Sequence, residues 1–148
     1  MILLFVGILP LLTGYIGNIL SWNYNILLLA NCLLLILWFY VSRTAGLKKQ
    51  NAFLTLIVLN LPAFLMLTGS YLFAYSENRF IHSVWVLSQL YYLPFSPIGS
   101  FLYINSLSGD EDVIFESIPL MFSVSFILIV LTALVGFHSS QNIEKLVK

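Results

Sequence analysis

The sequence predicts an all-α integral membrane protein, an antiparallel four-helix transmembrane bundle with a proline-broken helical hairpin on its outer side. Of its 148 residues, 60% are hydrophobic and only 8% are charged, whereas about a quarter of a soluble domain is charged. Four apolar stretches approach the roughly 20 residues that cross a bilayer. Because short segments connect them, we expect one domain over residues 1–148. This composition excludes a soluble enzyme or a soluble binding module.

The first two spans form a predicted helical pair. Residues 1–20 carry no charge and lack the positive n-region and cleavage site of a signal peptide, so we expect a retained helix. Residues 21–25 make a polar turn, in which Trp22 and Tyr24 suit the headgroup layer. The second span covers residues 26–42.

A basic loop separates this pair from the third span, which we predict over residues 52–75, and the last span covers residues 118–137. Arg43, Lys48 and Lys49 lie in this loop, and Lys and Arg in short loops mark the cytoplasmic side. With four spans, both termini are then cytoplasmic. We expect the plasma (inner) membrane of a bacterium, because the chain is small and its loops are minimal.

The stretch between the third and last spans is ambiguous. Residues 80–107 are apolar enough to cross a membrane, but Pro94 and Pro97 interrupt them. Proline removes a backbone donor and disfavours helix in the residue before it. We therefore predict two half-helices, about 80–93 and 99–107, forming a re-entrant or interfacial hairpin.

Five spans are the alternative to this arrangement. In that case the C-terminal tail, with Lys145 and Lys148, would lie outside. The four-span arrangement leaves only Arg79 of the basic residues outside, and it is therefore preferred.

Small and polar residues within the spans predict how the helices pack. Gly7, Gly14 and Gly17 share one stripe of the first helix, and such stripes let membrane helices approach closely. A docking face for a partner helix is the alternative. Asn31 and Asn60 lie near the bilayer centre on sequential helices, where we expect them to exchange hydrogen bonds. A polar substrate site at the midplane is the alternative there.

Evidence for chemistry is weak throughout the sequence. No Asp, Glu, Lys, Arg or His falls within the core of a span, which disfavours ion-coupled transport. Cys32 is the only cysteine, which excludes an intrachain disulfide and a cysteine-based zinc site. The acidic run of residues 110–112 with Glu116 suits a solvated loop better than a cation site, since no EF-hand or HExxH spacing accompanies it. We expect no metal site, no cofactor and no catalytic residue.

Partners other than lipid and protein are not expected. Six basic residues balance six acidic ones, so no basic excess exists to hold nucleic acid. His82 and His138, the only histidines, fall at opposite membrane faces in the four-span arrangement, which prevents them from ligating a haem together.

The outer hairpin carries the predicted recognition residues. Trp85, Tyr91 and Tyr92 offer large, rather rigid contact area, while His82 and Gln89 lie seven residues apart on one face and add hydrogen bonds. A membrane-interface belt is the simpler explanation for so many aromatic rings.

These observations favour a non-enzymatic, small multi-pass membrane protein that acts through contacts with another membrane protein or a membrane-active peptide. An accessory subunit and an immunity-type protein both fit, and a homo-oligomer is a further possible partner. A small transporter or channel protomer is the second hypothesis, with Asn31, Asn60 and Pro62 lining its path. An interfacial lipid-modifying enzyme that uses His82 and the acidic run is the third.

Overall fold

The computed structural model describes residues 2–48, 50–74, 79–97 and 113–146, and it describes the side chains of these residues except in 73–74, 79–82, 113–118 and 141–146. Every regular element in these ranges is helical. The elements are α1 (Ile2–Ile19), α2 (Tyr24–Leu47), α3 (Ala52–Ala74), α4 (Arg79–Tyr92), the 3₁₀-helix η1 (Leu93–Phe95) and α6 (Val113–Leu146).

Four of these helices are long and apolar enough to cross a membrane: α1, α2, Ala52–Leu72 of α3 and Pro119–Ser140 of α6. Each exposes large apolar side chains, such as Phe5, Leu33, Phe53 and Leu131. An outward apolar surface of this extent needs hydrocarbon around it. The chain is therefore an integral, multi-pass membrane protein, and the predicted four-span, all-helical fold is confirmed.

Local sequence explains the tight connection between α1 and α2. Asn23 is the N-cap of α2, where its side chain accepts a hydrogen bond from the backbone N–H of Ile26 at 3.1 Å. Ser21 turns the chain with a φ of 47°, in the left-handed region that few non-glycine residues adopt. The backbone N–H of Trp22 closes the turn on the carbonyl of Gly17 at 2.9 Å. The helical hairpin therefore reverses within four residues, Leu20 to Asn23.

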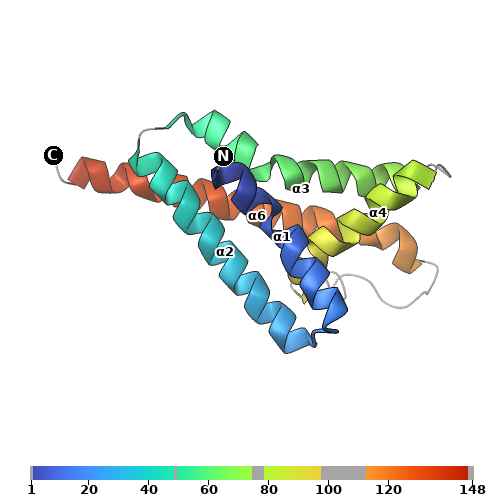
Figure 1. Cartoon of the computed structure of the whole chain (residues 1–148). Coiled ribbons are helices and arrows are strands. Elements are labelled where there is room, and N and C mark those ends of the chain that lie inside the picture. The colour runs from blue at the N-terminus through green and yellow to red at the C-terminus, as the bar shows by residue number, and fades with distance from the viewer. Residues whose placement is uncertain (1, 49, 75–78, 98–112, 147–148) are drawn as a thin grey trace.

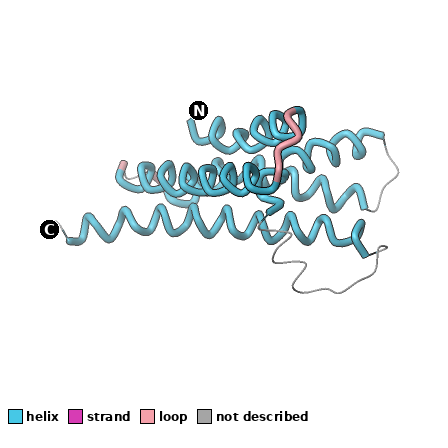
Figure 2. Tube along the Cα trace, turned by 90° about the horizontal axis from the view of Figure 1, so that it is seen from below, coloured by secondary structure: helices cyan, strands magenta, loops and turns pink. Residues whose placement is uncertain are grey.

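The helices meet at one end of the bundle and separate toward the other. The start of α1, the end of α2, the start of α3 and the end of α6 lie at one end, here called the basic end because Arg43 and Lys48 are there (Figure 1). Toward the opposite end, α1 and α2 slant away from α3 and α6, and α4 enters between them (Figure 1). Figure 2 shows the same helices from below.

The α2 helix packs mainly along α6 and only slightly on α3, although α3 follows it in sequence. A Cβ atom built at Gly46 would overlap Ser140, and one built at Gly136 would lie 2.5 Å from the carbonyl oxygen of Phe39. The contact that lies later in α2 also lies later in α6, so α2 and α6 run parallel. Close approach at two glycines gives this pair more contact than the expected sequential pairing of α2 with α3.

The α4 helix runs back along α3 toward the middle of the bundle. Gly69 of α3 faces Val84 near the start of α4, and Tyr92 at the end of α4 bonds to Ala63, halfway along α3. The chain then turns toward the end of the bundle at which α1 and α2 are connected. There the Tyr24 hydroxyl lies 3.4 Å from the carbonyl oxygen of Pro97. The first half of the predicted hairpin, about 80–93, therefore packs against the bundle. The second half, 99–107, lies outside the described residues.

Candidate functional site

Hydrogen bonds and glycine contacts fix α4 between α1 and α3. The Tyr91 hydroxyl donates to the carbonyl of Gly7 in α1, and the Tyr92 hydroxyl donates to the carbonyl of Ala63 in α3, each at 2.8 Å. Ser88 donates to the carbonyl of Met66 in α3 at 2.7 Å. Because both neighbouring helices are bonded, the position of α4 is determined from two sides.

Aromatic packing completes this attachment. The Tyr92 ring stacks on Phe122 of α6, with centroids 4.6 Å apart and planes inclined by 17°. The Tyr91 ring meets Tyr92 edge to face at 5.2 Å, and Trp85 lies 6.1 Å from Phe122. Offset stacking and edge contacts of this kind add to the stabilisation from burial alone. The end of α4 is therefore bound to three helices of the bundle.

The prediction that Trp85, Tyr91 and Tyr92 form an exposed recognition face on α4 is wrong. Tyr91 and Tyr92 are fully buried and Trp85 is 6% exposed, so their rings pack inside the bundle. The helix turns inward because its apolar rings gain more by burial in the bundle than in the interface. Gln89 is exposed. His82 lies in α4, and its side chain is outside the described residues.

The small-residue stripe of α1 meets three different neighbours. A Cβ atom at Gly7 would lie 2.7 Å from the carbonyl oxygen of Leu59 in α3, and one at Gly14 would overlap the carbonyl of Leu90 in α4. Gly17 faces the ring of Trp22 in the turn. The stripe is thus covered by the chain itself at each of these positions.

The expected hydrogen bond between Asn31 and Asn60 is wrong. The Oδ1 atom of Asn60 accepts from the indole N–H of Trp38 at 3.3 Å, and its amide N–H donates to the carbonyl of Leu56 at 2.8 Å. Both polar atoms of Asn31 are buried without a partner. Because α2 packs on α6 rather than along α3, Trp38 is the residue of α2 that reaches Asn60.

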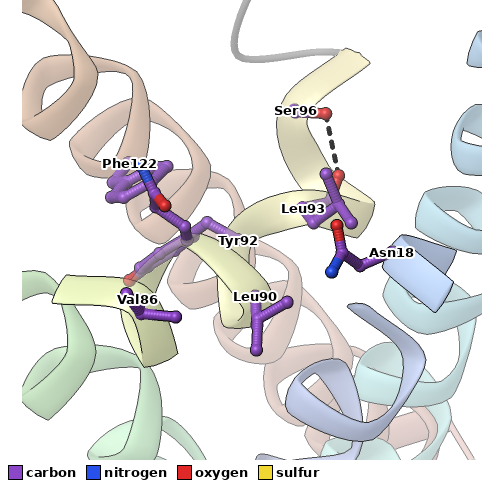
Figure 3. A pocket seen from close by; sticks show the side chains of 8 residues that line it. Asn18, Val86, Leu90, Tyr92, Leu93, Ser96 and Phe122 are labelled. Carbon is purple, nitrogen blue, oxygen red and sulfur yellow. Dashed lines mark hydrogen bonds between the residues drawn. The ribbon is translucent and has the colours of Figure 1, made fainter. Parts of the chain in front are cut away.

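A pocket of about 350 Å³ opens beside the end of α4. Its volume falls within the range of small-molecule and side-chain binding sites. We call it the amide pocket, because Asn18 and Gln89, whose side chains are both exposed, line it. Figure 3 shows Asn18 at its edge. Its lining comes from α1, α4, η1, the residue after η1 and α6: Asn18, Val86, Gln89, Leu90, Tyr92, Leu93, Ser96 and Phe122.

A proline ends α4 beside the pocket. Pro94 cannot donate a backbone hydrogen bond, so the α-helix ends at Tyr92 and the chain continues as a 3₁₀ turn. In that turn the Ser96 hydroxyl donates to the carbonyl of Leu93 at 2.8 Å (Figure 3). Asn18, near the end of α1, points toward Leu93 across the opening (Figure 3).

The lining of the amide pocket suits a neutral, amphipathic group. Its eight residues include no Asp, Glu, Lys, Arg or His, and its one phenol, Tyr92, already donates to Ala63. The two amides each offer donors and an acceptor, beside the apolar surfaces of Val86, Leu90 and Phe122. A peptide backbone with an apolar side chain has this combination of groups.

Sequence reasoning found Gln89 and Tyr92 but missed Asn18, Ser96 and Phe122 as pocket residues. Asn18 follows Gly14 by four residues and therefore continues the contact stripe of α1, which was an available signal. Phe122 lies on α6, far along the chain, and only its stacking with Tyr92 brings it to the pocket.

The acidic run, Cys32 and His138 are the other residues that the sequence singles out. The acidic run of residues 110–112 and the side chain of Glu116 lie outside the described residues. Cys32 is exposed on α2, and His138 is exposed on α6. Within the residues that the structure describes, no group of three His, Cys, Asp or Glu lies together as a metal site would require. Comparison of the chain with protein-family models, with curated proteins and with solved structures finds no match.

Proposed function

We propose that this chain is a non-enzymatic membrane protein that acts by binding another membrane protein or a membrane-active peptide, as an accessory subunit or an immunity-type protein. The amide pocket is the proposed contact site. The observation that carries this proposal is its lining, in which two exposed amides, Asn18 and Gln89, stand beside apolar side chains with no charged group among them.

Such a lining favours binding over catalysis. General acid–base or nucleophilic chemistry needs a titratable side chain or an activated nucleophile within reach of the substrate. The titratable group in the pocket is the Tyr92 phenol, and the hydroxyl of Ser96 is engaged by the carbonyl of Leu93. A polypeptide in a bilayer, in contrast, gains from amide hydrogen bonds that lipid cannot supply.

The orientation of the chain is part of the proposal. Basic residues at the basic end, Arg43 and Lys48, favour placing that end and both termini in the cytoplasm of a bacterial cell. The amide pocket lies in the half of the bundle where α1 and α2 are connected, away from the basic end. In this orientation it faces the outer leaflet of the plasma membrane. A membrane-active peptide arriving from outside would meet this half of the bundle first.

Site-specific photo-crosslinking tests the contact. A benzophenone amino acid at position 89, in the full chain and in native membranes, is expected to capture a polypeptide. The matched control places the same group at position 87, because Leu87 is 41% exposed on the same helix and does not line the pocket. Lipid adducts alone at both positions, or equal polypeptide capture at both, would contradict the proposal.

A substitution in the pocket adds a second test. Gln89→Leu keeps a side chain of similar size but removes the amide, and we expect it to reduce partner recovery about tenfold, because a buried hydrogen-bonding partner left unpaired costs about 1–3 kcal/mol. Leu87→Gln is the control and should leave recovery unchanged. Equal partner recovery with Gln89→Leu and the unaltered chain, at equal expression, would remove Gln89 from the contact.

A further inference from the structure

The amide of Asn31 is fully buried, and neither its nitrogen nor its oxygen has a hydrogen-bond partner. Within the described residues, the only other buried polar side-chain atom in this state is Nε of Arg43. Buried amides in folded proteins are almost always bonded to protein or to ordered water. Within the residues that the structure describes, the Asn31 amide therefore lacks the partner that such a buried group normally has.

The position of Asn31 on α2 shows which way its side chain faces. Tyr24, Asn31 and Trp38 follow each other at intervals of seven residues and so share one stripe of the helix. The Tyr24 hydroxyl reaches the carbonyl of Pro97 beyond η1, and the Trp38 indole reaches Asn60 of α3. Asn31 lies between these two contacts, and its side chain faces the interior of the bundle.

The helix that carries Asn31 also contacts irregular backbone. The α2 helix packs on η1, where Pro94 and Pro97 supply no backbone N–H. Non-helical backbone at membrane depth is tolerated where protein or water satisfies its polar groups. Asn31 is seven residues from the start of α2, about 10 Å along the helix axis, which places it within the span rather than at its edge.

The chemistry of the amide limits the kinds of ligand that it can bind. Its NH₂ group has two hydrogens to donate and its oxygen accepts, so the ligand must both accept and donate. The single amide oxygen does not by itself make a cation site, because Ca²⁺ takes six to eight oxygen ligands and Mg²⁺ an octahedral shell. Water both donates and accepts, and buried waters typically make about three hydrogen bonds.

We propose that Asn31 binds ordered water in the interior of the bundle, on the stripe of α2 between the contacts of Tyr24 and Trp38. The water donates a hydrogen bond to the amide oxygen and accepts one from the amide nitrogen. This inference is independent of the amide pocket, because Asn31 does not line it.

Radiolytic footprinting of the full chain in lipid nanodiscs, with water as the only probe, tests this site. Hydroxyl radicals formed from a bound water oxidise the side chains next to it. Leu34, one turn along the same face, is 4% exposed and is expected to be oxidised at least several-fold more than Ile129 of α6, which is fully buried. Leu33, 59% exposed toward lipid, reports whether bulk water reaches this depth.

A variant without the amide tests whether the water is bound by Asn31. In Asn31→Leu, oxidation of Leu34 should fall to the level of Ile129. Asn31→Met, with a more flexible side chain, replaces this variant if Asn31→Leu does not fold. Three results would overturn the proposal: no excess oxidation of Leu34 in the unaltered chain, unchanged oxidation in the folded variant, or oxidation of Leu33 equal to that of Leu34.

Discussion

The hydroxyl and ring of Tyr92 give the sharpest test of how α4 is held. Tyr92→Phe removes only the hydroxyl, which donates to the carbonyl of Ala63 at 2.8 Å. We expect this change to lower the free energy of unfolding by about 1 kcal/mol, the usual net value of one buried hydrogen bond. Tyr92→Ala also removes the ring stacked on Phe122, and we expect a loss of about 3–5 kcal/mol.

Tyr15 supplies the matched control, because it is 55% exposed on α1 and an exposed ring contributes little to the bundle. Tyr15→Phe and Tyr15→Ala should each change the free energy of unfolding by less than about 0.5 kcal/mol. Reversible unfolding in mixed micelles, followed by circular dichroism at increasing denaturing detergent, measures all four variants against the unaltered chain.

Two outcomes separate the folding role of Tyr92 from a recognition role. If Tyr92 were an exposed anchor for a partner, both of its variants would unfold like the unaltered chain and lose only binding. Equal stability of Tyr92→Ala and Tyr15→Ala would therefore refute the packing of α4 described above. A Tyr92→Phe loss as large as that of Tyr92→Ala would refute the assignment of most of the energy to the ring.

Three further predictions concern packing, depth and topology. Gly14→Ala should destabilise the bundle by about 1–3 kcal/mol, because its Cβ would overlap the backbone carbonyl of Leu90, which no rotamer change can move. Gly17→Ala should cost less, because its Cβ would contact side chains such as the Trp22 ring rather than backbone. Equal unfolding midpoints for the two variants would contradict this reasoning. Cys32 is exposed near the middle of α2, so a charged maleimide should leave it unlabelled in intact membranes and label it in denaturing detergent; rapid labelling in membranes would show that water reaches this face. Alkaline phosphatase fused after Lys148 should be inactive in a bacterial host, because four spans return the chain to the side of its N-terminus, which the basic loop places in the cytoplasm. An active fusion would contradict the cytoplasmic C-terminus.

Composition and proline placement were sufficient to predict the elements of the fold. Four apolar stretches gave four helices because a bilayer accepts only segments that satisfy their own backbone hydrogen bonds. Pro94 ended α4 at Tyr92, close to the predicted end of the first half-helix, because proline supplies no N–H to an α-helix. These properties are local, so they can be read from neighbouring residues alone.

Helix pairing and the environment of each ring were decided by the tertiary structure. Trp85, Tyr91 and Tyr92 fit an interface belt, a recognition surface or a core equally well by composition, and only the contacts of α4 with Gly7, Ala63 and α6 bury them. Likewise, Asn60 pairs with Trp38 and leaves Asn31 alone because α2 packs along α6 through Gly46 and Gly136. Apolar side chains lose little by facing either lipid or another helix, so hydrophobicity does not select the neighbour, and close backbone approach does.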